Sequence, residues 1–258
     1  MITVLQHALD IPGASLREFI RLWDTLEFQK SVNLHSLGEA IRGCRCNEFI
    51  RDALFSRYHT LISSKLFSEE YGLKLEELVL QNKQGGVFVI SLGRVQSVTR
   101  KILVEIVLNK IMKLLERKKI PPIFLFAEEA HLYLRETYWD DIVTRMRHFG
   151  IFPTFITNQP DAIKDAIYRQ VDNLILFNFN NDSDLEMISR ISTVDSDTIK
   201  KMAKTIPPGT CIVLGKVAYD LPVIVSVETT DIQTLGETNL FFKDHLQESL
   251  EIEIRNKY

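Results

Sequence analysis

Two adjacent carboxylates, Glu128 and Glu129, directly follow an apolar run at residues 123–127. A short run that is apolar on both faces is typical of a central strand in a covered parallel sheet. Polar side chains at the carboxyl end of such a strand lie in the crevice where ligands bind. There, one carboxylate can hold Mg²⁺, directly or through water, and the next can polarise an attacking water for phosphoryl transfer. The pattern is that of a Walker B strand.

An ordinary strand-to-helix turn is the alternative, because acidic residues are favoured at the positive end of the helix dipole. In the catalytic interpretation, Glu128 is the Mg²⁺-side carboxylate and Glu129 is the general base or water-orienting group. His131 is expected to support the site or lie on a helix face. It is not expected to bind a metal, because no His or Cys partner stands at ligand spacing.

A second apolar run, residues 152–157, ends shortly before Gln159. As a sensor, the Gln159 amide could hydrogen-bond the γ-phosphate or the attacking water, much as a glutamine orients water in GTPases. The alternative is a strand-end amide that caps the helix after Pro160. Between the two runs lie Arg145 and Arg147, cations that are favoured in the last turn of a helix.

The order of these features resembles the HerA/FtsK superfamily of hexameric DNA-translocating ATPases, and most closely its HerA-like helicases. The features are a strand with Glu-Glu-Ala-His, a helix, Arg-His-Phe-Gly, a strand with Asn-Gln-Pro, a helix and a strand. The resemblance covers about residues 84–216. It implies an α/β fold: a partial RecA-like P-loop NTPase core, with a mostly parallel sheet and helices on both faces, preceded by a helical segment.

The resemblance also suggests roles for two arginines. Arg147 aligns with an arginine of the family and is our candidate for a trans-acting arginine finger. Such an arginine reaches the active site of a neighbouring subunit and stabilises the transferring phosphoryl group. Arg145 is a competitor, each could be a solvated cation, and Met146 and His148 depart from the family's Gly and Lys. Arg94 lies where the family presents a loop near the pore, so it is a candidate DNA contact; a surface cation is the alternative.

One part of the ATPase machinery is absent from the sequence. A P-loop requires Gly-x-x-x-x-Gly-Lys-Ser/Thr, whose backbone amides and lysine cradle the phosphates. The nearest approach is Gly215-Lys216, which is followed by Val217. In the family, the P-loop precedes the equivalent of Met1. We therefore expect the C-terminal portion of an ATPase that uses ATP and Mg²⁺ when complete, whereas this chain alone should not bind them tightly.

Composition limits the possible partners. The 31 basic and 34 acidic residues give a formal charge of -3, which is not the basic footprint of many duplex-binding proteins, although pore loops alone could still be basic. Cys44, Cys46 and Cys211 show no disulfide framework or paired zinc spacing, so we expect ordinary thiols and no structural metal. With no apolar run near ~20 residues and no signal pattern, we expect a cytoplasmic protein without a membrane partner.

Three segments are predicted. Residues 1–83 form a mainly helical segment inserted in or packed on the core, residues 84–230 form the RecA-like core, and residues 231–258 form an extension expected to be helical. Within the core we expect a buried strand at 87–91 and a long helix ending at 117–119. Further strands are expected at 122–127, 152–157, 173–179, 210–214 and 221–227, with helices at 138–148, 161–169 and within 182–204.

Two functions fit these patterns. In the first, the chain is part of a ring oligomer, expected to be a hexamer, that couples ATP hydrolysis to translocation along double-stranded DNA in end processing or packaging. A nuclease is a further candidate partner, and DNA contacts would be salt-sensitive backbone contacts. In the second, the chain is a non-catalytic, P-loop-less paralogue that acts as an assembly or DNA-clamp module.

Overall fold

The computed structural model describes residues 1–67, 74–81, 85–93, 95–134, 146–182, 185–186 and 196–228. The N-terminal elements are helical: η1 (Val4–Ala8), α1 (Gly13–Phe28), α2 (Leu34–Arg42), α3 (Glu48–Ser63) and α4 (Leu75–Gln81). The central elements are α5 (Ser97–Glu116), β1 (Ile123–Ala127), α6 (His131–Leu134), β2 (Ile151–Phe155), η2 (Pro160–Ala162) and α8 (Asp165–Tyr168). The last described elements are β3 (Asn173–Phe177), α10 (Ser196–Thr205), β4 (Thr210–Gly215), η3 (Lys216–Ala218) and β5 (Val223–Ser226).

Side-chain caps define the starts of two N-terminal helices. Asn33 accepts a hydrogen bond from the Ser36 backbone N–H at 2.7 Å, and Asn47 accepts one from the Phe49 N–H at 2.9 Å. Each satisfies a backbone donor that has no partner within the helix. Helices α1, α2 and α3 then bury one apolar core together with η1, in which Phe19 is 1% exposed. The predicted helical character of this part of the chain is confirmed.

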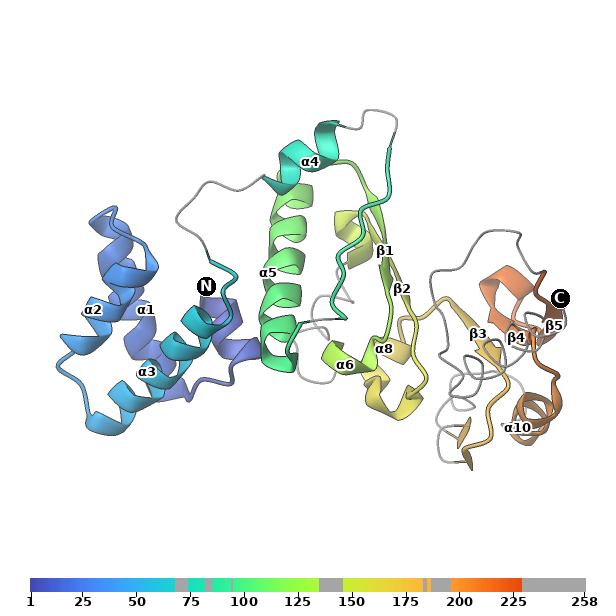
Figure 1. Cartoon of the computed structure of the whole chain (residues 1–258). Helices are drawn as coiled ribbons and strands as arrows, with labels where there is room; N and C mark the ends of the chain where they lie inside the picture. The colour runs from blue at the N-terminus through green and yellow to red at the C-terminus, as the bar shows by residue number, and fades with distance from the viewer. Residues whose placement is uncertain are drawn as a thin grey trace, which may run out of the picture.

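Helix α5 connects that core to the strands, as Figure 1 shows. Ile102 belongs to the N-terminal core, whereas Leu108, Leu114 and Leu115 pack in a second core with β1 and β2. Apolar side chains at a 3.6-residue period normally mark one helix face. In α5 the apolar side chains extend round the helix, because the N-terminal core packs on one side of it and the core with β1 and β2 packs on another.

The α/β class is confirmed, but the described strands form two sheets. β1 and β2 are parallel, with Ile123 opposite Ile151. β3, β4 and β5 form a separate antiparallel sheet. The expectation of a mostly parallel sheet is therefore corrected for the described strands. One reason is the short link between β4 and β5, residues 216–222, which suits a hairpin and is too short for a parallel crossover.

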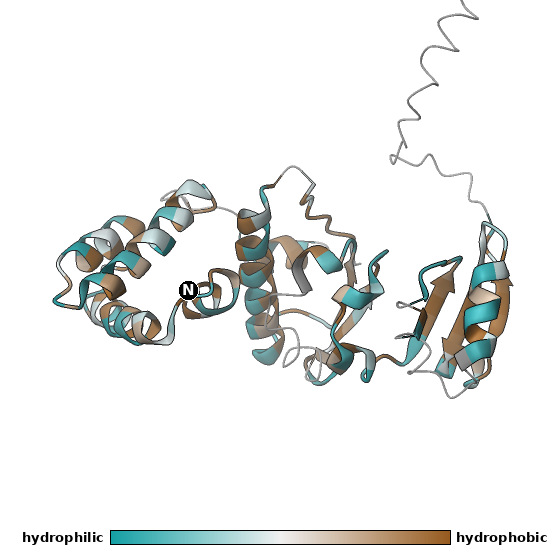
Figure 2. Ribbon diagram, turned by 90° about the horizontal axis from the view of Figure 1, so that it is seen from below, coloured by the Kyte–Doolittle hydropathy of each residue, from teal (hydrophilic) through white to brown (hydrophobic). Residues whose placement is uncertain are grey.

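Among the described residues, helices cover one face of each sheet, whereas the prediction placed them on both. α5 and α8 cover β1 and β2, and α10 covers β3 and β4. Figure 2 shows the strands of the second sheet as apolar ribbons with α10 alongside. Because side chains alternate between faces along a strand, the other face of each sheet is left bare in the described structure. The exposed apolar side chains there are Phe124, Phe126, Phe152, Ile175, Phe177, Val223 and Val225.

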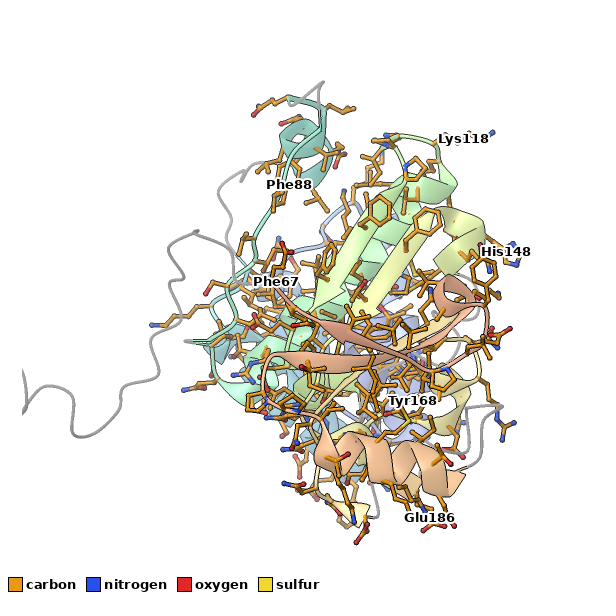
Figure 3. The ribbon with its side chains drawn as sticks, turned by 90° about the vertical axis from the view of Figure 1, so that its right-hand side faces the viewer. Phe67, Phe88, Lys118, His148, Tyr168 and Glu186 are labelled. Atoms are coloured by element: carbon orange, nitrogen blue, oxygen red, sulfur yellow. The ribbon has the colours of Figure 1, made fainter. Side chains whose placement is uncertain are left out.

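Two predicted elements differ from the structure. Residues 87–91 are not assigned to a strand, and Val87 and Val89 are 91% and 85% exposed, so the predicted buried strand is wrong. Figure 3 labels Phe88 on this segment. The helix predicted at 161–169 is broken into η2 and α8, because Ile163 has extended backbone angles. Most of the helix predicted at 138–148, and all residues after 228, lie outside the described residues.

Candidate functional site

The carboxyl ends of β1 and β2 bring the predicted catalytic residues to one edge of the parallel sheet. The Ala130 N–H donates to the Ile156 carbonyl at 2.9 Å, and the Ile156 N–H donates to the Ala127 carbonyl at 3.0 Å. These bonds hold the turn after β1, which carries Glu128 and Glu129, against the loop after β2. Parallel strands expose their ligand-binding loops at this end.

The two carboxylates lie in a turn and not in the first turn of a helix. Residues 128–130 form the turn, and α6 begins only at His131. Glu129 has φ of 51°, in the left-handed region that few residues other than glycine adopt. Its side chain is 52% exposed, and Glu128 is also exposed. Solvent, and therefore a water nucleophile or a hydrated cation, can reach both carboxylates.

A series of side-chain contacts leads from Glu129 to the loop after β2. Glu129 Oε2 lies 3.5 Å from His131 Nε2, and His131 Nδ1 lies 3.1 Å from Thr157 Oγ1. The Gln159 N–H donates to the same Thr157 oxygen at 3.0 Å. The sequence prediction missed Thr157. Its position just before Asn158-Gln159, at the end of the strand next to the acidic one, was the available signal.

Gln159 is exposed beside Thr157. It occupies the residue before η2, but its side chain forms no capping hydrogen bond with that turn, so the predicted capping alternative is not observed. The turn itself is anchored by Tyr168, labelled in Figure 3, whose buried hydroxyl donates to the Pro160 carbonyl at 2.9 Å. The backbone at Gln159 is thus fixed on both sides.

Arg147 lies at the opposite end of the parallel sheet. It precedes β2, whereas Glu129 follows β1, and the five residues of β2 span about 13 Å or more at roughly 3.3 Å per residue. The guanidinium is 73% exposed, with Nη1 3.5 Å from Asp172 Oδ2. Lys216 also pairs with Asp172, and Lys216 first, then Arg147, hold the pKa of this carboxyl below its ordinary value.

Gly215-Lys216 does not form a phosphate-binding loop. Gly215 has φ of 105°, and a Cβ placed there would lie 2.2 Å from the Asp172 carbonyl oxygen. The Lys216 N–H donates to that same oxygen at 3.0 Å. These contacts tie β4 to the start of β3, which explains both residues structurally. The phosphate cradle of an ATP site is therefore not supplied by this pair.

The two exposed carboxylates suit Mg²⁺, which takes hard oxygen ligands, keeps several waters, and is bound through one or two carboxylates plus substrate phosphates. Within the described ranges, no group of three or more His, Cys, Asp or Glu side chains could hold a metal ion by itself. Cys44, Cys46 and Cys211 are free thiols.

Two of the predicted site residues, Arg94 and Arg145, lie outside the described residues. Among the helices that the structure describes, none is long and apolar enough to cross a membrane.

No protein-family model matches the chain. The DNA double-strand break repair helicase HerA of Saccharolobus solfataricus is 25% identical over 184 residues, which cover 66% of this chain and 37% of that protein. The HerA of Sulfurisphaera tokodaii is 22% identical over 201 residues, covering 72% and 40%. The match thus spans about two fifths of these relatives.

Among solved structures, VirB4 of Thermoanaerobacter pseudethanolicus has a similar fold. Its TM-score is 0.59 at 11% identity, covering 89% of this chain and 67% of that chain. This likeness supports the partial RecA-like fold alone. The sequence matches to two HerA proteins, together with the acidic strand and its parallel neighbour in the predicted places, support a HerA-like ATPase.

Proposed function

We propose that this chain is the acidic-strand and sensor part of a ring-forming HerA-like ATPase that translocates along double-stranded DNA. The observation that carries the proposal is the shared edge at which Glu128, Glu129 and the Thr157–Gln159 loop meet. In the complete protein, Glu128 would hold Mg²⁺ against the ATP phosphates. Glu129 would orient the attacking water, and Gln159 would contact the γ-phosphate.

The phosphate cradle would come from further polypeptide. The 258 residues contain no Walker A sequence, and the matched HerA relatives extend well beyond the aligned part. The bare apolar faces support this proposal, because large exposed apolar patches usually mark an interaction surface. β2 and β3 are also edge strands in the described structure, so each has backbone groups available to pair with another strand.

Arg147 would act on the site of a neighbouring subunit. Its distance from Glu129, at the other end of the same sheet, argues against a role in its own site. Its exposed guanidinium can leave a surface ion pair with Asp172 at small cost, because such pairs contribute about 0–1 kcal/mol. This arrangement favours the ring assembly, for which a hexamer is expected.

DNA processing is the proposed role of the assembly. Both matched relatives are named as DNA double-strand break repair helicases. End processing, with a nuclease as a candidate partner, is therefore the first role to test, and packaging is the second. Contacts with the duplex, including that proposed for Arg94, would be to phosphates and would weaken with salt.

A non-catalytic assembly or DNA-clamp module is the second candidate, favoured by the absence of a Walker A sequence. The two functions can be separated by co-expressing the chain with the polypeptide encoded directly upstream in its reading frame. ATPase activity that requires both parts and is abolished by Glu129→Gln supports the first. If the upstream sequence lacks a Walker A motif, or if Glu129→Gln hydrolyses ATP as fast as the parent, the proposed catalytic role is wrong.

A further inference from the structure

His131 lies between two loops that carry proposed catalytic residues. Its side chain is 8% exposed, so the ring is fixed by its surroundings. Nε2 faces Glu129 Oε2 at 3.5 Å, and Nδ1 faces Thr157 Oγ1 at 3.1 Å. One imidazole thus contacts the turn after β1 with one nitrogen and the loop after β2 with the other.

The tautomer of the His131 ring is linked to the hydrogen bonds of Thr157. The Gln159 N–H donates to Thr157 Oγ1 at 3.0 Å, so the Thr157 hydroxyl proton goes to one of two acceptors: His131 Nδ1 at 3.1 Å or the Gln159 carbonyl at 3.3 Å. When the hydroxyl donates to Nδ1, the nearer of the two acceptors, the neutral imidazole carries its proton on Nε2. Nε2–H then faces Glu129 Oε2 at 3.5 Å. In the other tautomer, Nε2 would present a lone pair to that carboxylate and the contact would be lost.

The backbone keeps these groups in register. The bonds from Ala130 N–H to the Ile156 carbonyl and from Ile156 N–H to the Ala127 carbonyl join the two loops on either side of the ring. Glu129 has little local support, because its backbone is in the left-handed region and its side chain is half exposed. A side chain so placed depends on a neighbour for its orientation.

We propose that His131 is a positioning residue that couples the Glu129 carboxylate to the Thr157–Gln159 loop. Thr157 sets the tautomer of the ring, and the ring holds the carboxylate. The catalytic meaning of this coupling rests on the proposed function: engagement of Gln159 by a phosphate would move Thr157 and so alter the hold on Glu129.

The coupling can be tested on the chain itself by NMR, with ¹⁵N-labelled histidine and ¹³C-labelled glutamate. Signals are assigned by their loss in His131→Gln and Glu129→Gln. Thr157→Val should shift the His131 ring nitrogens and also the Glu129 carboxyl carbon, and Thr157→Ser should restore both. Thr154→Val, an exposed site on β2, is the matched control and should leave both unchanged.

Two NMR results would overturn the proposal. One is a Thr157→Val protein in which the ring nitrogens shift but the Glu129 carbon does not, since the contacts would then transmit nothing. The other is an equal shift in Thr154→Val, which would show a non-specific effect. Amide spectra that match those of the parent exclude misfolding of the variants. If Thr157→Val unfolds, Thr157→Ser still tests the proposal, because it should leave the His131 and Glu129 signals close to those of the parent.

A second arm uses the chain together with the Walker A-bearing part. Thr157→Val should lower kcat at least tenfold with ATP affinity within about twofold, and Thr157→Ser should recover most of it. Unchanged kcat in an active assembly would overturn the positioning role. An inactive parent assembly, together with intact coupling by NMR, would overturn the proposed function and uphold the coupling.

Discussion

Replacing Glu105 by Gln should stabilise the protein at neutral and alkaline pH. Glu105 lies on α5 and is fully buried, with 0% exposure. Its Oε1 accepts a hydrogen bond from Asn109 Nδ2 at 2.8 Å, but no described group donates to Oε2. Burial raises the pKa of this carboxyl, and the Asn109 hydrogen bond and the N-terminal ammonium of Met1 only partly oppose the shift. Glutamine keeps the acceptor for Asn109 and removes the charge.

The sign of the pH dependence follows from the raised pKa. Below an ordinary carboxyl pKa of about 4.3, Glu105 is neutral in both the folded and the unfolded chain, so parent and variant should be similar in stability. As the pH rises through the folded pKa, the unfolded chain gives up its proton more readily, and the parent loses stability. A buried acceptor left unpaired costs about 1–3 kcal/mol, and more when it is charged. At roughly 2–4 °C per kcal/mol for a chain of this size, Tm should rise by several degrees.

Urea unfolding at pH 4 and pH 8 measures this difference directly. Glu105→Gln should exceed the parent at pH 8 and match it closely at pH 4. Glu116→Gln, at the exposed end of the same helix, is the matched control and should show little change at either pH. If Glu105→Gln were less stable than the parent at pH 8, or if its gain were the same at both pH values, the charge-burial argument would be refuted.

Titrated alone with ATP and Mg²⁺, the chain should bind weakly or not at all in calorimetry, because the amide cradle and lysine are missing; micromolar affinity would contradict this. In the complete protein, Glu129→Gln should retain nucleotide binding and lower turnover by orders of magnitude in steady-state assays. Mixed with Arg147→Ala in rings that exchange subunits, it should regain part of the activity; no regain would reject the role in trans. Gly38→Ala should cost about 1–3 kcal/mol in urea unfolding, because its Cβ would lie 2.2 Å from the Tyr58 hydroxyl, whereas Gly13→Ala, with nothing within 4 Å, should be nearly neutral.

The sequence by itself determined the local elements near the proposed site. The apolar run before Glu128 predicts β1, and the 3.6-residue pattern predicts α5 to within a turn of its observed end at Glu116. β1 and β2 are consecutive strands joined by a long connection, so a parallel pair with Glu129 and Gln159 at one edge of the sheet could also be expected. Local pattern suffices there, since each element's period and flanking residues are properties of one segment.

Only the tertiary structure decided how the segments meet. Residues 87–91 read as a buried strand, yet no described strand pairs with them, because a strand requires a partner that local sequence does not specify. The bare faces around Phe124 and Ile175 depend in the same way on what covers them. The contact of His131 with Thr157, 26 positions apart in sequence, arises from the register of β1 against β2, which a one-residue slip would destroy.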